Sequence, residues 1–229
     1  MFNPACLPPP VRHNGLPCSG PLPLALSNDR TPEWRHPAVL VIASGNAHKV
    51  AEIRAMLDAV NLEVRRQPEG LEIEETGSTY RENARLKAET VARLTGCWAL
   101  ADDSGLEVDA LGGAPGLYSA RYAPTDQERI QRLLQELGDS PYRSASFNSA
   151  MALADPRGTI VVEAQGICRG EILTAAAGQG GGYDPIFWVR EAGMTYAQMG
   201  QHLKDKLGSR GKAARALAPA LKRWLGLSA

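Results

Sequence analysis

Several short stretches of the sequence carry residues that could bind phosphate or a metal ion. Ser44-Gly45-Asn46 lies between an apolar run and a helical pattern, and Lys49 follows it. Backbone N–H groups at a helix N-terminus are unpaired, so a glycine turn followed by a lysine can hold phosphate oxygens. The simpler interpretation is a strand-to-helix turn in which Ser44 or Asn46 caps the helix and Lys49 is solvated. The stretch is not a Walker A loop, because GxxxxGK[ST] is absent.

Two acidic stretches could hold a cation. Glu74-Glu75 precedes a helical pattern, and Asp102-Asp103 directly follows the apolar run 98–101. Adjacent carboxylates are costly to place together unless a cation or solvent relieves their repulsion. Hard oxygen ligands suit Mg²⁺, which usually takes one or two carboxylates together with substrate phosphates. The alternatives are a solvated acidic turn for Glu74-Glu75 and a helix cap for Asp102-Asp103.

A glycine-rich stretch, 180–182, stands beside Tyr183 and Asp184. Glycines let a backbone approach a flat ligand closely, so Tyr183 could stack on a base while Asp184 accepts hydrogen bonds from it. A tyrosine packed in the core would give the same sequence. Downstream lies a basic cluster that is either a solvated helix end or an anion clamp. Its members are Lys204, Lys206, Ser209, Arg210 and Lys212.

The elements that must position these residues alternate between strand and helix patterns. Strands are expected at 38–43, 61–66, 98–101, 147–154 and 159–165, and helices at 49–57, 79–94, 125–137 and 211–224. The last two strands are joined by the turn Asp155-Pro156-Arg157-Gly158, which makes them a hairpin-like pair. This order predicts an α/β fold with a mixed central sheet and flanking helices.

Composition limits the classes of protein that the chain can belong to. Residues 1–36 carry eight prolines and no periodicity, so we expect a disordered extension followed by one domain at 37–229. The formal net charge is zero, which argues against nucleic acid as a partner. No apolar run reaches the roughly 18 residues of a membrane helix. The four cysteines have no CxxC spacing, so reduced thiols and a cytoplasmic location are expected.

The order of the motifs resembles the inosine triphosphate pyrophosphatase family, whose members hydrolyse non-standard purine nucleoside triphosphates. The motifs are SGNAHK, EETGSTYRENA, ADDSGLEVDALGGAPGLYSARYA, GGGYDPIF and KxxxxxRG. They run from about Val39 to Leu225, over four fifths of the chain. Each motif alone is unspecific, but five in the same order are unlike a chance agreement.

The resemblance implies a two-lobed α/β fold around a long cleft, a homodimer, and Mg²⁺-dependent hydrolysis of dITP, ITP and XTP to the monophosphate and pyrophosphate. It makes Asp103 the base and a metal-linked residue, with Glu75 as a metal ligand and Asp102 as a further one. The triphosphate would be held by Ser44, Gly45, Asn46, Ala47, His48 and Lys49. Further substrate contacts would be Ser104, Gly181, Gly182, Tyr183, Asp184, Lys204, Ser209 and Arg210.

Two positions differ from the family pattern, and the resemblance assigns both of them to recognition of the base. Gly181 stands where the family has phenylalanine, and Ser209 stands where it has histidine. Serine can donate one hydrogen bond but presents no imidazole, and the departures at Gly181 and Ser209 together predict weaker discrimination between purines than is usual in the family. The alternatives are a Maf-like pyrophosphatase of other base specificity, against which the long ADDSG motif speaks, and a nucleotide-binding protein that has lost catalysis.

Overall fold

The computed structural model describes residues 39–57 and 62–226, so the predicted extension at 1–36 lies outside the described residues. The strands are β1 (Val39–Ile42), β2 (Glu63–Arg66), β3 (Trp98–Val108), β4 (Ser144–Ala154), β5 (Ile160–Ile172), β6 (Phe187–Val189) and β7 (Met194–Thr195). The helices are α1 (Ala47–Leu57), α2 (Tyr80–Thr95), α3 (Asp126–Leu137), α4 (Gln201–Leu207) and α5 (Ser209–Trp224).

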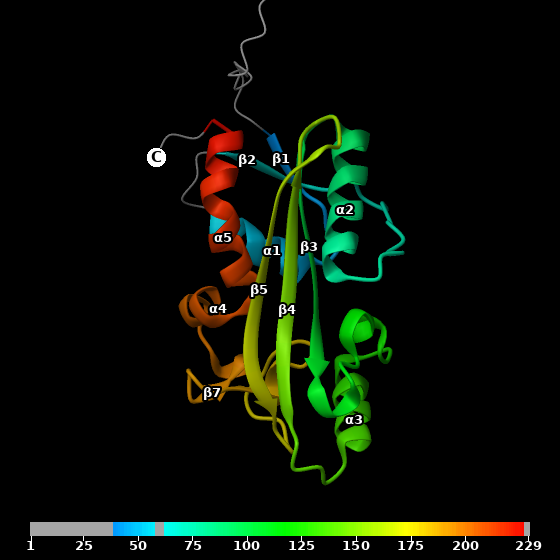
Figure 1. Cartoon of the computed structure of the whole chain (residues 1–229), viewed down its shortest axis with the longest axis vertical. Helices are drawn as coiled ribbons and strands as arrows, with labels where there is room; N and C mark the ends of the chain where they lie inside the picture. Colours follow the sequence, from blue (N-terminus) through cyan, green and yellow to red (C-terminus); the bar gives the residue numbers. More distant parts are fainter. Residues whose placement is uncertain (1–38, 58–61, 227–229) are drawn as a thin grey trace, which may run out of the picture. The chain divides into compact units, whose positions relative to one another are not determined.

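The strands form one seven-stranded sheet in the order β2-β1-β3-β4-β5-β6-β7. β1 pairs in parallel with β2 and β3, whereas β3, β4, β5, β6 and β7 pair antiparallel in sequence. Figure 1 shows the long β3, β4 and β5 side by side, with α2 on one side of them and α5 on the other. The predicted α/β fold with a mixed sheet is confirmed.

The two faces of the sheet bury different side chains. Successive residues of a strand point to opposite faces, so leucines and alanines that alternate along β3 and β4 separate into two cores. On one face Leu100, Met151 and Leu153 pack with α1 and α5. On the other face the alanines of β3 and β4 pack with Ala84 and Ala88 of α2. The small side chains let α2 lie close to the sheet.

A third core lies at the other half of the sheet, around the C-terminal ends of β3 and β5 and the N-terminal end of β4. Phe187, Leu106 and Leu133 belong to it, and α3 covers it. α3 begins with a capping box in which the Thr125 hydroxyl accepts from the Glu128 N–H, and it ends at Gly138, as the sequence predicts. Among residues 39–57 and 62–226, two cores therefore lie at the β1 half of the sheet and one at the other half.

Several boundaries differ from the sequence prediction. β3 does not end before the acidic pair but runs through Asp102 and Asp103 to Val108, so neither residue is a helix cap. β4 and β5 are also longer than predicted, because they continue the hairpin over the third core. The basic cluster forms α4 and the start of α5, which begins at Ser209 rather than Gly211.

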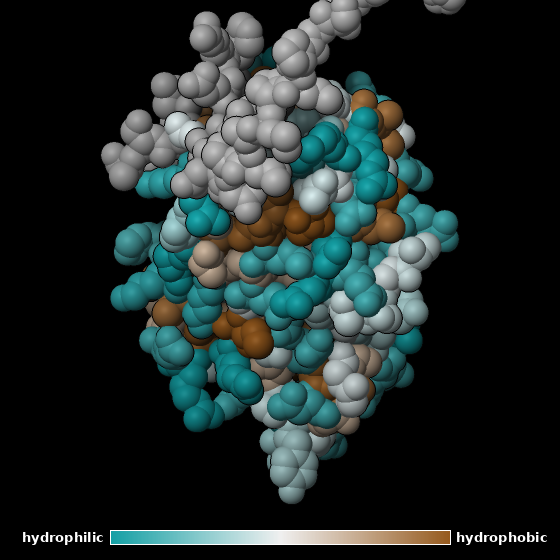
Figure 2. All heavy atoms as spheres, turned by 45° about the horizontal axis from the view of Figure 1, so that its top comes forward, coloured by the Kyte–Doolittle hydropathy of each residue, from teal (hydrophilic) through white to brown (hydrophobic). Residues whose placement is uncertain are grey.

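The surface is mixed in polarity. On the face shown in Figure 2, hydrophilic side chains predominate and hydrophobic ones reach the surface in small groups among them. Within the described residues, no helix is both long and apolar enough to span a bilayer.

Candidate functional site

A cavity of about 570 Å³ opens between the two halves of the sheet. Its walls come from the start of α1, the middle of β3, the turn at Gly116–Arg121, the segment around Tyr183 and the start of α5. Lys49 and Asp103 face this same cavity, one from α1 and the other from β3. The first lysine and the acidic pair of the sequence analysis therefore converge on one volume.

The open edge of β3 explains why this cavity exists. β1 runs beside β3 only as far as Leu100, whereas β4 accompanies β3 from Ala99 to Val108. Among the described strands, β3 therefore has a neighbour on one side only beyond Leu100. Adjacent residues on this exposed edge point to opposite faces, and both faces border the cavity. Asp102 faces α1 and α5, while Asp103 faces α2.

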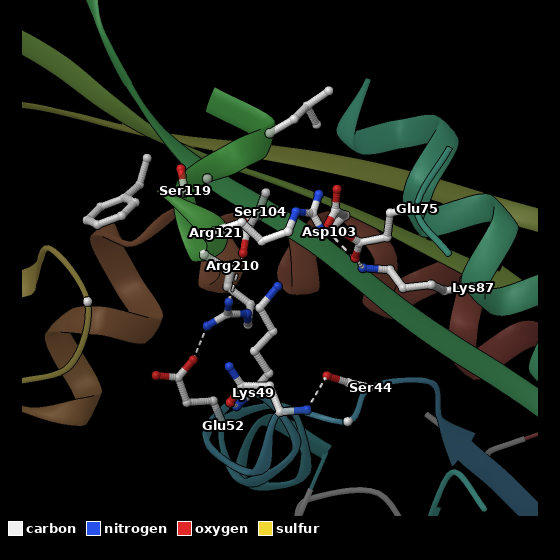
Figure 3. Close-up of a pocket in the computed structure, with 18 of the residues that line it drawn as sticks. Ser44, Lys49, Glu52, Glu75, Lys87, Asp103, Ser104, Ser119, Arg121 and Arg210 are labelled. Carbon is white, nitrogen blue, oxygen red and sulfur yellow. Dashed lines mark hydrogen bonds and ion pairs between the residues drawn. The ribbon is translucent and has the colours of Figure 1, made fainter. Parts of the chain in front are cut away.

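The start of α1 has the features of a phosphate-binding turn. The Asn46 side-chain oxygen accepts from the N–H of His48 at 2.9 Å and of Lys49 at 3.3 Å, so Asn46 caps the helix. Ser44 Oγ accepts from the Asn46 N–H at 3.2 Å, and both residues line the cavity. The capping interpretation and the phosphate interpretation are compatible, because the cap leaves the turn facing the cavity (Figure 3).

Lys87 of α2 joins two of the predicted acidic residues. Its Nζ donates to Glu75 Oε1 at 2.8 Å and to Asp103 Oδ1 at 2.9 Å. Asn83, one turn earlier on α2, donates to Asp103 Oδ2 at 3.2 Å, and Arg121 donates to Glu75 Oε2 at 3.0 Å. Figure 3 shows Glu75, Asp103 and Lys87 pointing toward one another at one wall of the cavity.

Burial and charge act on these carboxylates in opposite directions. Burial raises the pKa of Asp103 above its ordinary value although Lys87 and Lys49 oppose the rise, and Glu75 adds to it. Burial alone would also raise the pKa of Glu75, but Lys87 and Arg121 outweigh it and lower that pKa. Of this pair, Asp103 is therefore the better proton acceptor.

Asp102 has different surroundings from Asp103. Its side chain is fully buried, and its Oδ2 pairs with Lys49 Nζ at 3.0 Å and with the Arg210 guanidinium at 3.3 Å. Burial would raise the pKa of Asp102, but Arg210 and Lys49 hold it well below its usual range. Arg210 also pairs with Glu52 of α1. Asp102 thus orients two cations toward the cavity without lining it.

The donor set fits a magnesium ion that is completed by substrate. Glu75 and Asp103 line the cavity with hard carboxylate oxygens, each already oriented by hydrogen bonds. Mg²⁺ usually takes one or two carboxylates and keeps water or phosphate oxygens in its other positions. Among the described residues, no cluster of three or more His, Cys, Asp or Glu side chains could hold a metal alone.

The part of the cavity around Tyr183 has more aromatic side chains than the part around Lys49 and Asp103. Tyr183 is 4% exposed, packs in the third core and donates from its hydroxyl to the Ser119 carbonyl at 3.0 Å, although it also lines the cavity. Asp184 pairs with Lys204 at 3.0 Å, and burial raises the pKa of Asp184 against the opposing charge of Lys204. Ser209 Oγ lies 2.9 Å from Ser149 Oγ.

Most of the residues predicted for the site meet in this cavity. Those that line it are Ser44, Gly45, Asn46, Lys49, Glu75, Asp103, Ser104, Gly182, Tyr183, Asp184, Ser209 and Arg210. Those that the structure places outside the lining are Ala47, His48, Asp102, Gly181 and Lys204. Of these, Asp102 and Lys204 still act on it through ion pairs with lining residues.

Sequence reasoning missed several polar residues of the site. They are Glu52, Asn83, Lys87, Arg121 and Ser149. A signal was present for two of them, because Asn83 and Lys87 are four residues apart and interrupt the apolar face of α2. The others were hidden, since their partners lie between 46 and 158 positions away in sequence.

Comparison with known proteins gives a consistent result. The chain is 54% identical over 188 residues to the dITP/XTP pyrophosphatase of Synechococcus sp. (strain CC9311), covering 82% of this chain and 91% of that protein. It is 53% identical over 192 residues to the dITP/XTP pyrophosphatase of Nostoc sp. (strain PCC 7120 / SAG 25.82 / UTEX 2576), and the match covers 83% of this chain and 98% of that protein.

Solved structures agree with these relatives. A HAM1 protein from Coxiella burnetii matches with a TM-score of 0.74 at 40% identity, covering 81% of this chain and 98% of that one. The Staphylococcus aureus Ham1 protein matches with a TM-score of 0.72 at 37% identity, and the match covers 80% of this chain and 98% of that one. The Ham1 family itself matches residues 40–220. The motifs, the sheet that positions them and these similarities agree: the chain belongs to the Ham1 family.

Proposed function

We propose that this protein hydrolyses non-standard purine nucleoside triphosphates, dITP, ITP and XTP, to the monophosphate and pyrophosphate. The observation that carries the proposal is the single cavity shared by the α1 N-terminus, Lys49 and the Glu75–Lys87–Asp103 group. Relatives at 53–54% identity are dITP/XTP pyrophosphatases, which supports the same reaction here.

The cationic wall binds the triphosphate. Lys49 and Arg210 face the cavity, and the buried carboxylate of Asp102 holds both of them in place. The N-terminal end of α1, which Asn46 caps, adds the partial positive charge of the helix dipole on the same side. A polyphosphate brings several negative charges, so these groups select for it and fix its direction in the cavity.

Asp103 is the base that takes a proton from the attacking water. Its raised pKa makes it a better proton acceptor than Glu75, and Lys87 with Asn83 fixes its orientation. Glu75 and Asp103 would hold Mg²⁺, which when bound supplies positive charge to stabilise the phosphate oxygens. A water aligned on the α-phosphorus gives the monophosphate and leaves pyrophosphate as the departing group.

The direct test is product analysis in ¹⁸O-labelled water with ITP and Mg²⁺. Attack at the α-phosphorus releases pyrophosphate and places the label in IMP, whereas attack at the terminal phosphorus releases labelled orthophosphate. Asp103→Asn should reduce pyrophosphate release by about 10² to 10⁴, the usual contribution of a general base. Asp139→Asn, an exposed aspartate on the turn after α3, is the matched control and should keep wild-type turnover.

Two results would contradict the proposal: label in orthophosphate, or near-full pyrophosphate release by the Asp103 variant. A homodimer stays a prediction from the sequence resemblance, and a cytoplasmic location stays a prediction from the spacing of the cysteines.

A further inference from the structure

The Glu75 carboxylate has a different cation on each of its two oxygens. Lys87 Nζ donates to Oε1 at 2.8 Å, and Arg121 donates to Oε2 at 3.0 Å. Asp103 also uses both of its oxygens, one for Lys87 and the other for Asn83. A divalent cation on Glu75 would lie beside two positive groups and would repel both of them. It therefore competes with Lys87 and Arg121 for this carboxylate.

The partners differ in how firmly they are held. The Lys87 side chain is 11% exposed and bridges both carboxylates, and Asn83, 1% exposed, also accepts from the Gly77 N–H at 2.8 Å. The Arg121 side chain is 53% exposed, and within residues 39–57 and 62–226 Glu75 is its only hydrogen-bond or ion-pair partner. Because a half-exposed ion pair contributes little free energy, Arg121 is the partner that leaves first.

The backbone that carries Arg121 is fixed, although its side chain is not. Arg121 is the last residue of the turn Gly116–Arg121, which packs directly on β3. A Cβ on Gly105 of β3 would lie 2.3 Å from the Gly116 carbonyl oxygen, so the two segments are in close contact. Ser119 Oγ accepts from the Leu106 N–H at 2.9 Å, which adds a hydrogen bond between them. A guanidinium released from Glu75 therefore stays at the cavity.

The cavity offers this guanidinium one suitable class of ligand. Lys49 and Arg210 line the same cavity, and both are paired with Asp102 on the opposite face of β3 (Figure 3). A polyphosphate bound by these two cations brings further anionic oxygens into the cavity that Arg121 also lines. A guanidinium matches phosphate oxygens because its N–H donors form a planar fork.

We propose that Arg121 is an exchangeable cation of the site, which pairs with Glu75 until Mg²⁺ takes that carboxylate and then binds a phosphate group of the nucleotide. The inference rests on the proposed function and adds a substrate-binding residue to it. The exchange keeps every charge paired, since the carboxylate gains the metal and the phosphate gains Arg121. Arg121 thereby couples the two ligands, so that each one makes the other bind more tightly.

The test compares three dissociation constants of wild type and Arg121→Ala. The first is that of Mn²⁺, used in place of Mg²⁺ because electron paramagnetic resonance counts the free ion, measured without nucleotide. The other two are those of an ITP analogue with a methylene bridge between the α and β phosphates, measured by calorimetry with saturating Mn²⁺ and in EDTA.

The variant should bind Mn²⁺ about 2- to 5-fold more tightly, because the competitor for Glu75 is gone. With Mn²⁺ it should bind the analogue about 10-fold more weakly, because a charge-assisted hydrogen bond to phosphate is lost. In EDTA the loss should stay below about 3-fold, because Arg121 of the wild type is then still paired with Glu75. A fixed charge would instead give the same loss with and without metal.

Arg85→Ala is the matched control. Arg85 of α2 is 47% exposed and pairs with Glu163 at 3.6 Å, but it lies outside the cavity lining. It should leave all three constants unchanged. Arg121→Lys, a second variant that keeps the charge, should bind Mn²⁺ like wild type and lose less affinity for the analogue than the alanine variant. Thermal unfolding checks that each variant is folded.

Three results would overturn the proposal. They are weaker Mn²⁺ binding by folded Arg121→Ala, unchanged binding of the analogue with Mn²⁺, and an equal loss of analogue affinity with Mn²⁺ and in EDTA. Failure of the proposed function would look different. In that case the wild type would release no pyrophosphate from ITP, whatever the three constants of Arg121→Ala show.

Discussion

At the scale of single residues, Lys87 shows how one side chain can organise a site. It is a buried cation whose Nζ donates to Glu75 and Asp103, and its side chain is only 11% exposed. Burial would lower the pKa of Lys87, but the two carboxylates raise it. Lys87 therefore stays charged and holds two acidic groups close together at the wall of the cavity.

Replacing Lys87 with methionine should destabilise the protein by about 3 kcal/mol at neutral pH, because Asp103 loses its ion-pair partner and Glu75 keeps only Arg121. Burial already raises the pKa of Asp103 above its ordinary value, and loss of Lys87 would raise it further, so the cost of the charged carboxylate is present at high pH and disappears as Asp103 binds a proton. The difference from wild type should narrow as the pH falls toward 5. Urea unfolding at pH 7 and pH 5 measures this.

Lys206→Met, on the exposed part of α4, is the control and should change stability by less than about 0.5 kcal/mol. An equal loss of stability for the Lys87 variant at both pH values would mean that packing, not charge, explains the effect.

At the scale of elements, the site depends on where β1 ends and where α5 begins. The early end of β1 exposes the edge of β3, and the contact between Gly166 and α5 places Ser209 and Arg210 at the cavity. A Cβ at Gly166 would lie 2.1 Å from the Ser209 carbonyl oxygen and 2.6 Å from the Ala213 nitrogen. Both atoms belong to the backbone, so the helix itself must move.

Gly166→Ala should therefore lower the free energy of unfolding by about 1–3 kcal/mol, the usual cost of overpacking, and raise KM for ITP as Arg210 shifts. Gly200→Ala is the matched control, since a Cβ there would meet no atom within 4 Å. It should cost less than about 1 kcal/mol, because Gly200 is only a helix N-cap. Equal effects of the two substitutions would show that α5 does not pack on β5 as described.

At the scale of the whole domain, the cavity borders two of the cores: Phe147 and Tyr183 belong to the third core, and Leu71 and Ile73 pack against the core under α2. Its lining combines cations such as Lys49 and Arg210 with acids such as Glu75 and Asp103 from distant parts of the chain. A ligand that contacts both halves of the sheet adds contacts that the folded chain lacks. Such a ligand binds the folded state alone and stabilises it by mass action.

A non-hydrolysable ITP analogue with a methylene bridge between the α and β phosphates should raise Tm in the presence of Mg²⁺. At about 100 times the dissociation constant the gain is about 2.7 kcal/mol, roughly 5–10 °C for a domain of this size. Removal of Mg²⁺ with EDTA should reduce the shift, and inosine without phosphates should give little. The same shift with and without Mg²⁺ would contradict a metal held by Glu75 and Asp103.

The sequence alone determined the elements and most members of the site. Alternating apolar patterns placed the main helices and the starts of most strands within a few residues, because periodicity is a local property, but β3 and β5 run seven residues beyond their predicted ends. Each motif by itself left a structural alternative open, and it was their order, through the resemblance to a family, that predicted roles for Lys49, Glu75, Asp103 and Arg210.

Only the tertiary structure decided which of these residues are partners. Asp102 and Asp103 are neighbours in sequence, yet the alternation along β3 separates them: Asp102 becomes a buried counterion of Lys49 and Arg210, while Asp103 faces Lys87. Ser149 and Ser209, 60 positions apart, form one pair because α5 packs across the sheet. Local patterns encode which way a side chain points, but the distance between two remote side chains depends on how all the elements pack.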